Sequence, residues 1–494
     1  MNLGMLLRAA GLPCEPRAEL AQQQITGVCS DSRRVREGEI FVALRGLHHD
    51  GARYVAQALG RGAAFAICEQ PLEGKNTMVV EDARAALARL LDAWYGHPAA
   101  GLSLIGITGT NGKTSTAYML FEILRAAGHS VGLIGTVECR YNDTVLHAPN
   151  PQATANMTTP DPAELYFLLS EMKRLGAKYV VMEVTSHALA FGKVEPLHFH
   201  RAVFTNLTPE HLDLHGDMES YFLEKRKLFV KCEAAVVSAL GAYGKRLAAG
   251  LECPVSELCD GDLVDIVYRG VEGVSFGVGR CGGSVLALTV PVPGRFAVEN
   301  AALAALTACS LGIPDSVIQG ALAAFGGVRG RMERVAQNPL GITVFLDYAH
   351  TPDALEKLLL SVRDFCASEQ RICLLFGCGG DRDRSKRKEM GRIGSRLCDF
   401  LVLTSDNCRG ESADAILEEI LKGVDKEKPY CVIRDREKAI HYAIEHARAG
   451  DILILAGKGH EEYEIRGTQR LPFSERRIVE AAIEKRLRAA QDAN

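Results

Sequence analysis

Short apolar runs recur along the chain, and most of them end in polar, glycine-rich sequence. In the first hundred residues they occupy 25–29, 38–44, 64–68 and 77–80, with a helical pattern over 52–61. Later runs lie at 102–107, 133–137, 179–184, 202–205, 342–347, 371–376, 400–404 and 452–456. Buried runs of this length, separated by helical patterns, are typical of a parallel sheet covered by helices. The pattern therefore predicts an α/β fold with mostly parallel, doubly wound sheets.

Breaks in this alternation divide the chain, whose 494 residues exceed what one core organises. His97-Pro98, followed by Ala-Ala-Gly, marks a linker, and a glycine cluster from Gly326 to Gly330 marks a second boundary. The glycine-rich segment 240–295 is expected to form an antiparallel excursion. We expect an N-terminal α/β domain, a central domain and a third, nucleotide-fold-like domain, at 1–95, 96–330 and 331–494.

Composition narrows the class of protein. The chain is 47% apolar and 24% charged with a net charge of −4, so no overall basic field draws it to nucleic acid. No run approaches the ~20 apolar residues of a membrane helix, and the N-terminus does not resemble a signal peptide. The 15 cysteines are irregularly spaced without a C-x-x-C pair, which is typical of reduced thiols in a cytoplasm.

The stretch Gly106–Ser115 carries the clearest chemistry. A strand pattern precedes it, and a helical pattern over 116–127 follows it. Glycines in such a turn let backbone N–H groups close around a phosphate at a helix N-terminus. Lys113 would reach the outer phosphates, and the Thr114 hydroxyl would bind Mg²⁺. The alternative is a tight turn that contains Gly-Lys-Thr by chance, but its flanking elements favour a phosphate-binding loop.

Polar groups after two later strands could complete a phosphoryl-transfer site. Glu183 ends the run 179–184 and could bind Mg²⁺, while Thr185 or Ser186 could instead cap a helix. His211 and His215 follow the run 202–205 together with two carboxylates, and their spacing also occurs in zinc sites. The magnesium interpretation needs fewer assumptions. Groups from later in the chain could close over the nucleotide: Asn300, Arg331, Asp347 and His350.

Motifs spread over almost the whole chain resemble the Mur ligase family, in particular its diamino-acid-adding branch. Thr108–Thr114 matches the ATP loop that this family shares with folylpolyglutamate synthetases. The further motifs are Asp31–Arg33, Thr158–Pro160, Met182–Ala188, Thr205–His211, His215–Met218, Gly330–Glu333, Asp347–Ala354, Gly377–Arg382 and Gly457–Glu461.

This resemblance implies a three-domain, monomeric ligase: a UDP-binding N-terminal domain, a central ATPase-like domain, and a Rossmann-like C-terminal domain for the amino acid. Its cofactors would be ATP and Mg²⁺. It would add a diamino acid to UDP-N-acetylmuramoyl-L-alanyl-D-glutamate through an acyl phosphate, during cytoplasmic synthesis of peptidoglycan precursors.

The resemblance also implies roles for individual residues. The UDP-sugar would contact Ser30, Ser32, Leu47, His48, His49, Thr158, Thr159, Thr185 and Lys193, the last usually Arg in the family. ATP would contact Gly109, Thr110, Asn111, Gly112, Lys113, Thr114, Ser115, Asn300, Arg331, Asp347 and His350. The metal ligands would be Thr114, Glu183, His211 and Lys225, at the position of the family's carbamylated lysine. The catalytic set would be Lys113, Glu183, His211, Lys225 and Arg331.

The amino-acid pocket would comprise Arg382, Asp406, Asn407, Cys408, Arg409, Gly457 and Glu461. The family's diaminopimelate enzymes carry Asp-Asn-Pro-Arg, whereas this chain has Cys408 in place of the proline. Arg409 can pair with the distal carboxylate of meso-diaminopimelate, which L-lysine lacks, so meso-diaminopimelate is favoured and L-lysine is the alternative.

Three other functions remain open at this stage. A folylpolyglutamate synthetase would lack the unit at 1–95, and a ligase that adds D-alanyl-D-alanine would lack the segment at 406–409. A non-catalytic nucleotide switch need not keep Lys113, Glu183, His211 and Lys225 together.

Overall fold

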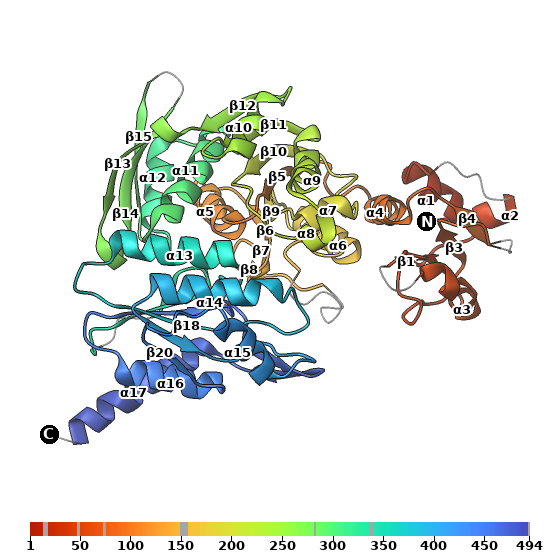
Figure 1. The fold of residues 1–494 in the computed structure, drawn as a ribbon. Coiled ribbons are helices and arrows are strands. Elements are labelled where there is room, and N and C mark those ends of the chain that lie inside the picture. Colours follow the sequence, from red (N-terminus) through yellow and green to blue (C-terminus); the bar gives the residue numbers. More distant parts are fainter. Residues whose placement is uncertain are drawn as a thin grey trace.

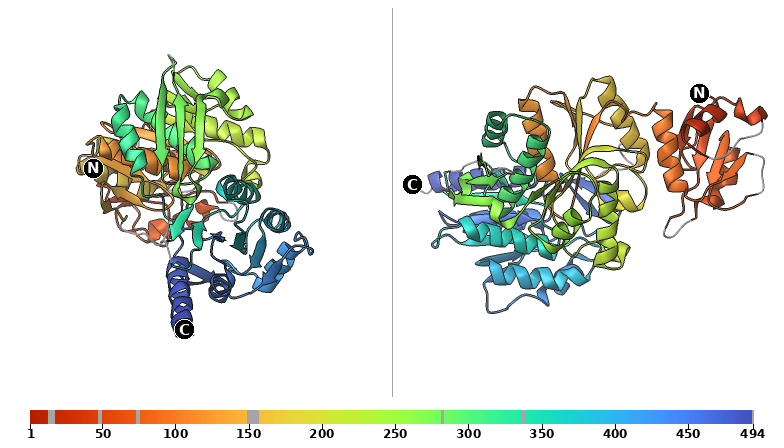
Figure 2. Two further views of the ribbon diagram at one scale, coloured as in Figure 1. Left: turned by 90° about the vertical axis from the view of Figure 1, so that its left-hand side faces the viewer. Right: turned by 90° about the horizontal axis from the view of Figure 1, so that it is seen from above.

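The computed structural model describes residues 1–12, 18–46, 50–72, 76–148, 157–280, 283–335 and 339–492. It confirms an α/β protein in which three mainly parallel sheets follow one another along the chain. Figure 1 shows the N-terminal unit standing apart from a larger body formed by the rest of the chain. The described ends of the chain lie at opposite ends of the molecule in Figure 1 and in the right-hand view of Figure 2.

The N-terminal unit holds a four-stranded parallel sheet with the strands in sequence order. Its strands are β1 (Gly27–Cys29), β2 (Glu39–Val42), β3 (Phe65–Cys68) and β4 (Thr77–Val79). Its helices are α1 (Leu3–Ala9), α2 (Ala18–Ala21), α3 (Val55–Gly60) and α4 (Ala83–Trp94). The helix predicted over 52–61 begins as a 3₁₀ turn, Gly51–Tyr54, before α3.

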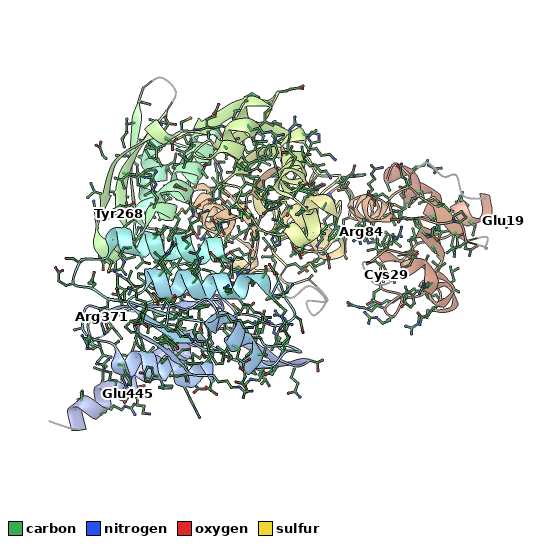
Figure 3. The ribbon with its side chains drawn as sticks, viewed as in Figure 1. Glu19, Cys29, Arg84, Tyr268, Arg371 and Glu445 are labelled. Carbon is green, nitrogen blue, oxygen red and sulfur yellow. The ribbon has the colours of Figure 1, made fainter. Side chains whose placement is uncertain are left out.

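Helix α4 connects this unit to the rest of the molecule. Leu87 and Leu91 on α4 belong to the same apolar core as Leu165 on α6 (Pro162–Arg174). Arg89 adds a bidentate ion pair to Glu195, with N–O distances of 3.0 and 2.9 Å. Arg84, labelled at the junction in Figure 3, places its guanidinium carbon 4.5 Å from the centroid of a phenylalanine ring in the central domain. Apolar packing and charge pairing therefore both hold the junction.

The central sheet has eight strands in the order β12-β11-β10-β5-β9-β6-β7-β8. They are β5 (Ser103–Thr108), β6 (Val131–Ile134), β7 (Cys139–Tyr141), β8 (Thr144–Val145), β9 (Tyr179–Glu183), β10 (Phe199–Phe204), β11 (Cys232–Ser238) and β12 (Val255–Leu258). Strand β7 pairs antiparallel with both β6 and β8, and the other pairings described for this sheet are parallel. Leu104, Ile105 and Ile107 of β5 are fully buried because helices cover both faces of the sheet, which explains the continuous apolar run.

The central helices are α5 (Lys113–Ala126), α6, α7 (Ser186–Ala190), α8 (Leu212–His215), α9 (Met218–Val230), α10 (Ala242–Ala249), α11 (Arg295–Ser310) and α12 (Asp315–Ala323). The antiparallel excursion is present as β13 (Leu263–Tyr268), β14 (Val274–Gly279) and β15 (Val285–Val290). It is shorter than predicted, since α10 and the parallel strand β12 occupy its first part. Leu247 and Ala248 of α10 are buried, so its apolar face, rather than its glycine content, decides the local structure.

The third sheet has the order β16-β17-β21-β18-β19-β20 and is parallel except for β16. Its strands are β16 (Glu333–Val335), β17 (Thr343–Asp347), β18 (Ile372–Phe376), β19 (Phe400–Leu403), β20 (Tyr430–Val432) and β21 (Ile452–Ala456). A hairpin, β22 (Tyr463–Arg466) and β23 (Gln469–Pro472), follows it.

The helices of this part are α13 (Pro352–Phe365), α14 (Ser385–Leu397), α15 (Ala413–Leu421), α16 (Arg436–His446) and α17 (Glu475–Asp492). Figure 1 shows α13 between the green central helices and the blue C-terminal sheet. Leu355 and Leu359 on α13 share one apolar core with Ala301 on α11. The C-terminal ends of β5 and β17 are therefore held on either side of one interface.

Candidate active site

The glycine-rich loop after β5 forms the centre of the candidate site. Helix α5 begins at Lys113, three residues earlier than predicted, so its N-terminus opens directly from the loop. Gly109 and Gly112 have φ angles of +149° and +84°, and a Cβ on Gly112 would lie 2.3 Å from the Asn300 side-chain oxygen. Only glycine fits these positions. The Lys113 Nζ donates to the carbonyl oxygens of Gly109 and Thr110 at 3.0 and 2.8 Å.

Glu183 lies at the end of β9 against this loop. Its side chain is only 1% exposed, and the Thr114 hydroxyl donates to Oε2 at 2.9 Å. Thr136, which the sequence analysis did not single out, donates from its backbone N–H to Oε1 at 2.8 Å and from its hydroxyl to Oε2 at 3.1 Å. Arg331 approaches the Thr114 hydroxyl at 3.5 Å. A hydroxyl and a carboxylate, both hard oxygen donors, thus meet beside the phosphate loop, as a magnesium site requires.

Three imidazoles gather next to Glu210. The His187 and His211 rings lie 4.7 Å apart, His187 and His215 lie 5.9 Å apart, and the His215 Nε2 is 3.0 Å from the Ser186 hydroxyl. Surrounding protein and the nearby Lys113 lower the pKa of His211 to about 4, so its partly exposed ring is neutral at pH 7. A neutral imidazole can ligate a metal.

Within the described ranges, no three His, Cys, Asp or Glu side chains are placed to hold a metal ion. Mg²⁺ is different, because it usually binds one or two carboxylates together with substrate phosphates.

Lys225 reaches the same loop from α9. Its side chain is 2% exposed, and Nζ donates to the Gly109 carbonyl oxygen at 2.9 Å. The Nζ atom lies 4.7 Å from the centroid of the Tyr221 ring. Burial, followed by repulsion from Lys113, lowers the pKa of Lys225 well below its usual range, and Glu210 offsets this only in part. This shift is in the direction of the neutral amine, which is the form that reacts with CO₂.

A cavity of about 410 Å³ lies between the central and C-terminal parts of the chain. The candidate residues that line it are Thr110, Asn111, Gly112, Lys113, Thr114, Ser115, Thr158, Glu183, Thr185, His211, Asn300, Arg331, Asp347 and His350. Asp347 accepts hydrogen bonds from the backbone N–H groups of Met332 and Ala349 at 2.7 and 2.8 Å, and burial raises its pKa. The structure therefore brings the predicted early and late groups together around one cavity.

Asp353, at the start of α13, also crosses this interface. Its Oδ2 accepts hydrogen bonds from the Asn111 amide and the Thr208 hydroxyl, both at 2.8 Å, and Lys357 pairs with it at 3.0 Å. Asp353 lies in the motif Asp347–Ala354, but the sequence pattern gives it no role of its own. A carboxylate beside a helix N-terminus is ordinarily a helix-capping group, so the motif alone did not indicate an interdomain contact.

The predicted UDP-sugar residues occupy two places. Ser30 and Ser32 lie just after Cys29, which Figure 3 labels at the end of β1, and the Ser32 hydroxyl donates to Gln57 at 3.3 Å. Leu47, His48 and His49 lie outside the described residues.

Of the other four, Thr158 and Thr185 line the cavity described above. Thr159 donates to the Glu183 carbonyl oxygen at 3.0 Å and accepts from the Thr185 N–H at 3.0 Å. The Thr158 and Thr136 hydroxyl oxygens lie 3.0 Å apart, and Lys193 forms a 2.7 Å ion pair with Asp161. Thr185 also caps α7, as the sequence allowed, by accepting from the Ala188 N–H at 3.1 Å.

The predicted amino-acid residues lie on three loops at the C-terminal ends of β18, β19 and β21. Asn407 donates from Nδ2 to the Glu461 carboxylate at 2.8 Å, and burial raises the pKa of Glu461. Gly457 has a φ of +112°, and a Cβ there would lie 2.8 Å from the Asp406 carboxylate. Arg409 donates from Nη1 to the Gly380 carbonyl oxygen at 2.9 Å.

Cys408 and Arg382 are the remaining two residues of the predicted amino-acid pocket. Cys408 is buried and its thiol donates to the Asp406 carbonyl oxygen at 3.3 Å. The Arg409 N–H donates to the carbonyl oxygen of Ile465 in β22 at 3.1 Å, which holds the loop where the family's proline is missing. Arg382 is exposed, and its side chain extends from the neighbouring loop.

Comparisons with known proteins match these parts of the chain. Sequence-family models described as Mur ligase family, catalytic domain; Mur ligase middle domain; and Mur ligase, glutamate ligase domain match residues 24–95, 107–308 and 330–459. The UDP-N-acetylmuramoyl-L-alanyl-D-glutamate--2,6-diaminopimelate ligase of Gloeobacter violaceus is 41% identical, covering 98% of this chain and 99% of its own. The Chlorobaculum tepidum ligase of the same name is 42% identical, covering 97% of each chain.

Solved structures give the same picture. A structure of a UDP-N-acetylmuramoyl-L-alanyl-D-glutamate--2,6-diaminopimelate ligase superposes with a TM-score of 0.69 at 28% identity, covering 99% of this chain and all of its own. A Mycobacterium tuberculosis folylpolyglutamate synthase, at 18% identity and a TM-score of 0.62, shares the fold over 74% of this chain and 90% of its own.

Proposed function

This chain belongs to the Mur ligase family, and from that premise we propose how its residues divide the work of the reaction. It is a diaminopimelate-adding ligase of peptidoglycan precursor synthesis, which joins 2,6-diaminopimelate to UDP-N-acetylmuramoyl-L-alanyl-D-glutamate with ATP. Residues 1–95 hold the UDP-sugar, 96–330 hold ATP, and 331–494 bring the amino acid.

One observation carries this division of labour. The phosphate loop with Lys113 and Glu183 belongs to the central domain, whereas Arg331, Asp347 and His350 come from the C-terminal part, and all of them line one cavity. A ligase needs this arrangement because its two chemical steps must share one reaction centre without exposing the activated intermediate to water.

In the first step, an oxygen of the substrate's D-glutamyl carboxylate attacks the γ-phosphorus of ATP. The bond from that phosphorus to the β–γ bridging oxygen breaks, ADP leaves, and an acyl phosphate forms. Lys113 and Arg331 oppose the negative charge of the phosphates, and loop N–H groups orient them. The Lys113 Nζ exchanges its bonds to the Gly109 and Thr110 carbonyl oxygens for phosphate oxygens.

The site also fits Mg²⁺. Thr114 and Glu183 supply hard oxygen donors, and His211, which lines the same cavity, supplies a neutral nitrogen. Bound there with ATP, Mg²⁺ would neutralise phosphate charge. Lys225 is proposed to add CO₂: its neutral Nζ bonds to the carbon and releases a proton, and the resulting carbamate can serve a second Mg²⁺.

In the second step, the free amine of the amino acid attacks the acyl carbon. A tetrahedral intermediate forms and the attacking nitrogen loses a proton. The intermediate collapses with breakage of the carbon–oxygen bond, and that oxygen leaves with the phosphate, which takes up the proton. Arg409 and Arg382 bind the distal carboxylate of meso-diaminopimelate, and Glu461 binds the distal ammonium. L-Lysine has no distal carboxylate and would leave the guanidinium groups without an anionic partner.

Two broader features complete the proposal. None of the described helices is long and apolar enough to cross a membrane. We propose that the enzyme acts in the cytoplasm as a monomer, where ATP is available and where its scattered cysteines stay reduced.

A phosphate-release assay tests the proposed function. It combines the enzyme, ATP, Mg²⁺ and UDP-N-acetylmuramoyl-L-alanyl-D-glutamate with meso-diaminopimelate, and product mass is measured in parallel. Phosphate release that requires both substrates, with one product heavier by one diaminopimelate residue, is expected. Phosphate release that ignores the muramoyl substrate would overturn the assignment.

A further inference from the structure

Lys458 is a buried cation that the proposed reaction does not use. It lies in the loop after β21, between Gly457 and Gly459, and its side chain is 0% exposed. The Nζ donates to the Asn407 Oδ1 at 3.0 Å and to the Tyr463 carbonyl oxygen at 2.9 Å. A carboxylate oxygen of Asp406 lies 3.9 Å away. Removing a lysine ammonium from water costs free energy, and the contacts that compensate for this cost can indicate a role for the residue.

The first contact fixes which way the Asn407 amide faces. Its Oδ1 accepts from two donors, the Lys458 Nζ at 3.0 Å and the Ile465 N–H at 2.9 Å. With the oxygen held on that side, Nδ2 must face the opposite side. There it donates to the Glu461 Oε2 at 2.8 Å. The chain of contacts therefore runs from Lys458 through Asn407 to the carboxylate proposed to meet the distal ammonium.

Lys458 also adjusts charge around that carboxylate. Burial, followed by repulsion from Asp406, raises the pKa of Glu461, while Asn407 and Lys458 oppose the rise. Asp406 shows the opposite balance: burial would raise its pKa, but Lys458 and Arg436 outweigh burial and lower it. The cation thus opposes the rise in the pKa of Glu461 and lowers the pKa of Asp406, so it stabilises the ionised form of both neighbouring carboxylates.

We propose that Lys458 is a positioning residue for amino-acid selection: it orients the Asn407 amide and thereby presents the Glu461 carboxylate to the distal ammonium of the incoming diamino acid. The inference rests on the proposed function, since it assumes that Glu461 meets the substrate. Lys458 itself does not touch the substrate.

A merely structural role would look different. Arg436 already ties both loops to the domain core, because it donates to the carbonyl oxygens of Ser405 and Ala456 at 3.0 and 2.8 Å. Removing Lys458 leaves that anchor in place. Its loss should therefore change how Asn407 and Glu461 face the pocket more than whether the loops exist.

A double-mutant cycle on Lys458 and Asn407 tests the proposal. Steady-state KM values for meso-diaminopimelate, ATP and the muramoyl substrate are measured for the wild type, Lys458→Met, Asn407→Ala and the double variant. Lys458→Met is expected to raise the KM for meso-diaminopimelate by roughly 10- to 100-fold, the range for losing an oriented, charge-assisted contact. The other two KM values should stay within about twofold of the wild type.

The double variant gives the decisive comparison. If Lys458 acts through Asn407, the double variant should be no worse than Asn407→Ala alone. Fully multiplicative effects, or equal increases in all three KM values, would overturn the proposal. Arg486→Met is the control, because Arg486 also donates to two backbone carbonyl oxygens of the same domain, those of Ile444 and Ala447, which do not belong to the amino-acid loops.

A second variant covers the case in which Lys458→Met does not fold. Asn407→Asp keeps an acceptor for Lys458 but loses the donor to Glu461, so it should show the same selective rise in KM. An unchanged KM for meso-diaminopimelate in Asn407→Asp would reject the proposal. If the wild type itself does not turn over meso-diaminopimelate, the proposed function fails instead, and the two failures remain distinguishable.

Discussion

Replacing Arg436 by methionine should destabilise the C-terminal domain in a way that depends on pH. Arg436 is 1% exposed and donates from Nε to the Glu475 Oε1 at 2.7 Å. Its other two nitrogens serve backbone carbonyl oxygens next to the amino-acid loops. Methionine fills much of the volume but leaves the Glu475 carboxylate, itself 2% exposed, without its cation.

The loss in the free energy of unfolding depends on the cost of leaving the buried Glu475 carboxylate unpaired. Breaking one side of a buried ion pair costs about 3–5 kcal/mol. The carboxyl can limit this cost by taking up a proton, and protonating an ordinary glutamate at pH 7 costs about 3.7 kcal/mol. We therefore expect a loss of about 3–4 kcal/mol at pH 7, or roughly 6–15 °C in the melting temperature of a domain of this size.

The same reasoning sets the sign of the pH dependence. In the variant, the folded state holds a proton on Glu475 that the unfolded state releases at neutral pH. Protonation becomes cheaper as pH falls, by about 1.36 kcal/mol per unit. The stability gap between wild type and Arg436→Met should therefore narrow by about 2 kcal/mol between pH 7 and pH 5.5.

Urea denaturation followed by circular dichroism at both pH values measures these gaps. Arg436→Met/Glu475→Gln removes the stranded charge and should recover most of the loss at pH 7. A gap that is equal at pH 7 and pH 5.5, or a double variant no more stable than the single one, would refute the reasoning.

Three further predictions concern the active site and its surroundings. Lys113→Ala should abolish phosphate release but leave the melting temperature within a few degrees of the wild type, because the hydrogen bonds of the lysine go to loop carbonyl oxygens. Activity above about 1% of the wild type would rule out the phosphate-loop assignment. Gly457→Ala should lower the melting temperature and raise the KM for diaminopimelate, since the φ angle of Gly457 is +112° and a Cβ there would lie 2.8 Å from the Asp406 carboxylate. A variant with the melting temperature and the KM of the wild type would contradict this. Burial lowers the pKa values of His187 and His460 in the folded protein to about 4. As the pH falls below about 6.5, these histidines take up protons in the unfolded state but not yet in the folded state, so the free energy of unfolding should fall between pH 6.5 and 4. Denaturation at a series of pH values should show a shallower loss for His460→Gln than for the wild type.

The sequence predicted the fold where apolar runs are continuous. Strands such as β5, β9 and β21 are buried on both faces, so their residues are apolar or small, except Glu183, which ends β9 at the candidate site. β10 was predicted too short because it begins with Phe199-His200-Arg201. Arg201 lies in a strand because its guanidinium donates to the side chain and carbonyl oxygen of Ser310 on α11, which no local pattern reveals.

The site divides in the same way. The glycine loop, Glu183 and the other groups that follow strands could be located from the sequence, because each directly follows an apolar run that predicts a strand. Asp353 and Lys458 could not, because their roles depend on partners 242 and 51 residues away in the sequence. A charged residue in a loop is ordinarily solvated, and only the folded structure shows that Lys458 is buried against Asn407.

The choice of amino acid is the most direct test of the account. The measurement is kcat/KM for meso-diaminopimelate and for L-lysine, determined by phosphate release and product mass for the wild type and for Arg409→Ala. We expect the wild type to favour meso-diaminopimelate. Arg409→Ala should lose roughly 10- to 100-fold in kcat/KM for that substrate alone, with the KM for ATP unchanged. A wild type that prefers L-lysine, or an Arg409→Ala variant impaired only towards ATP, would contradict it.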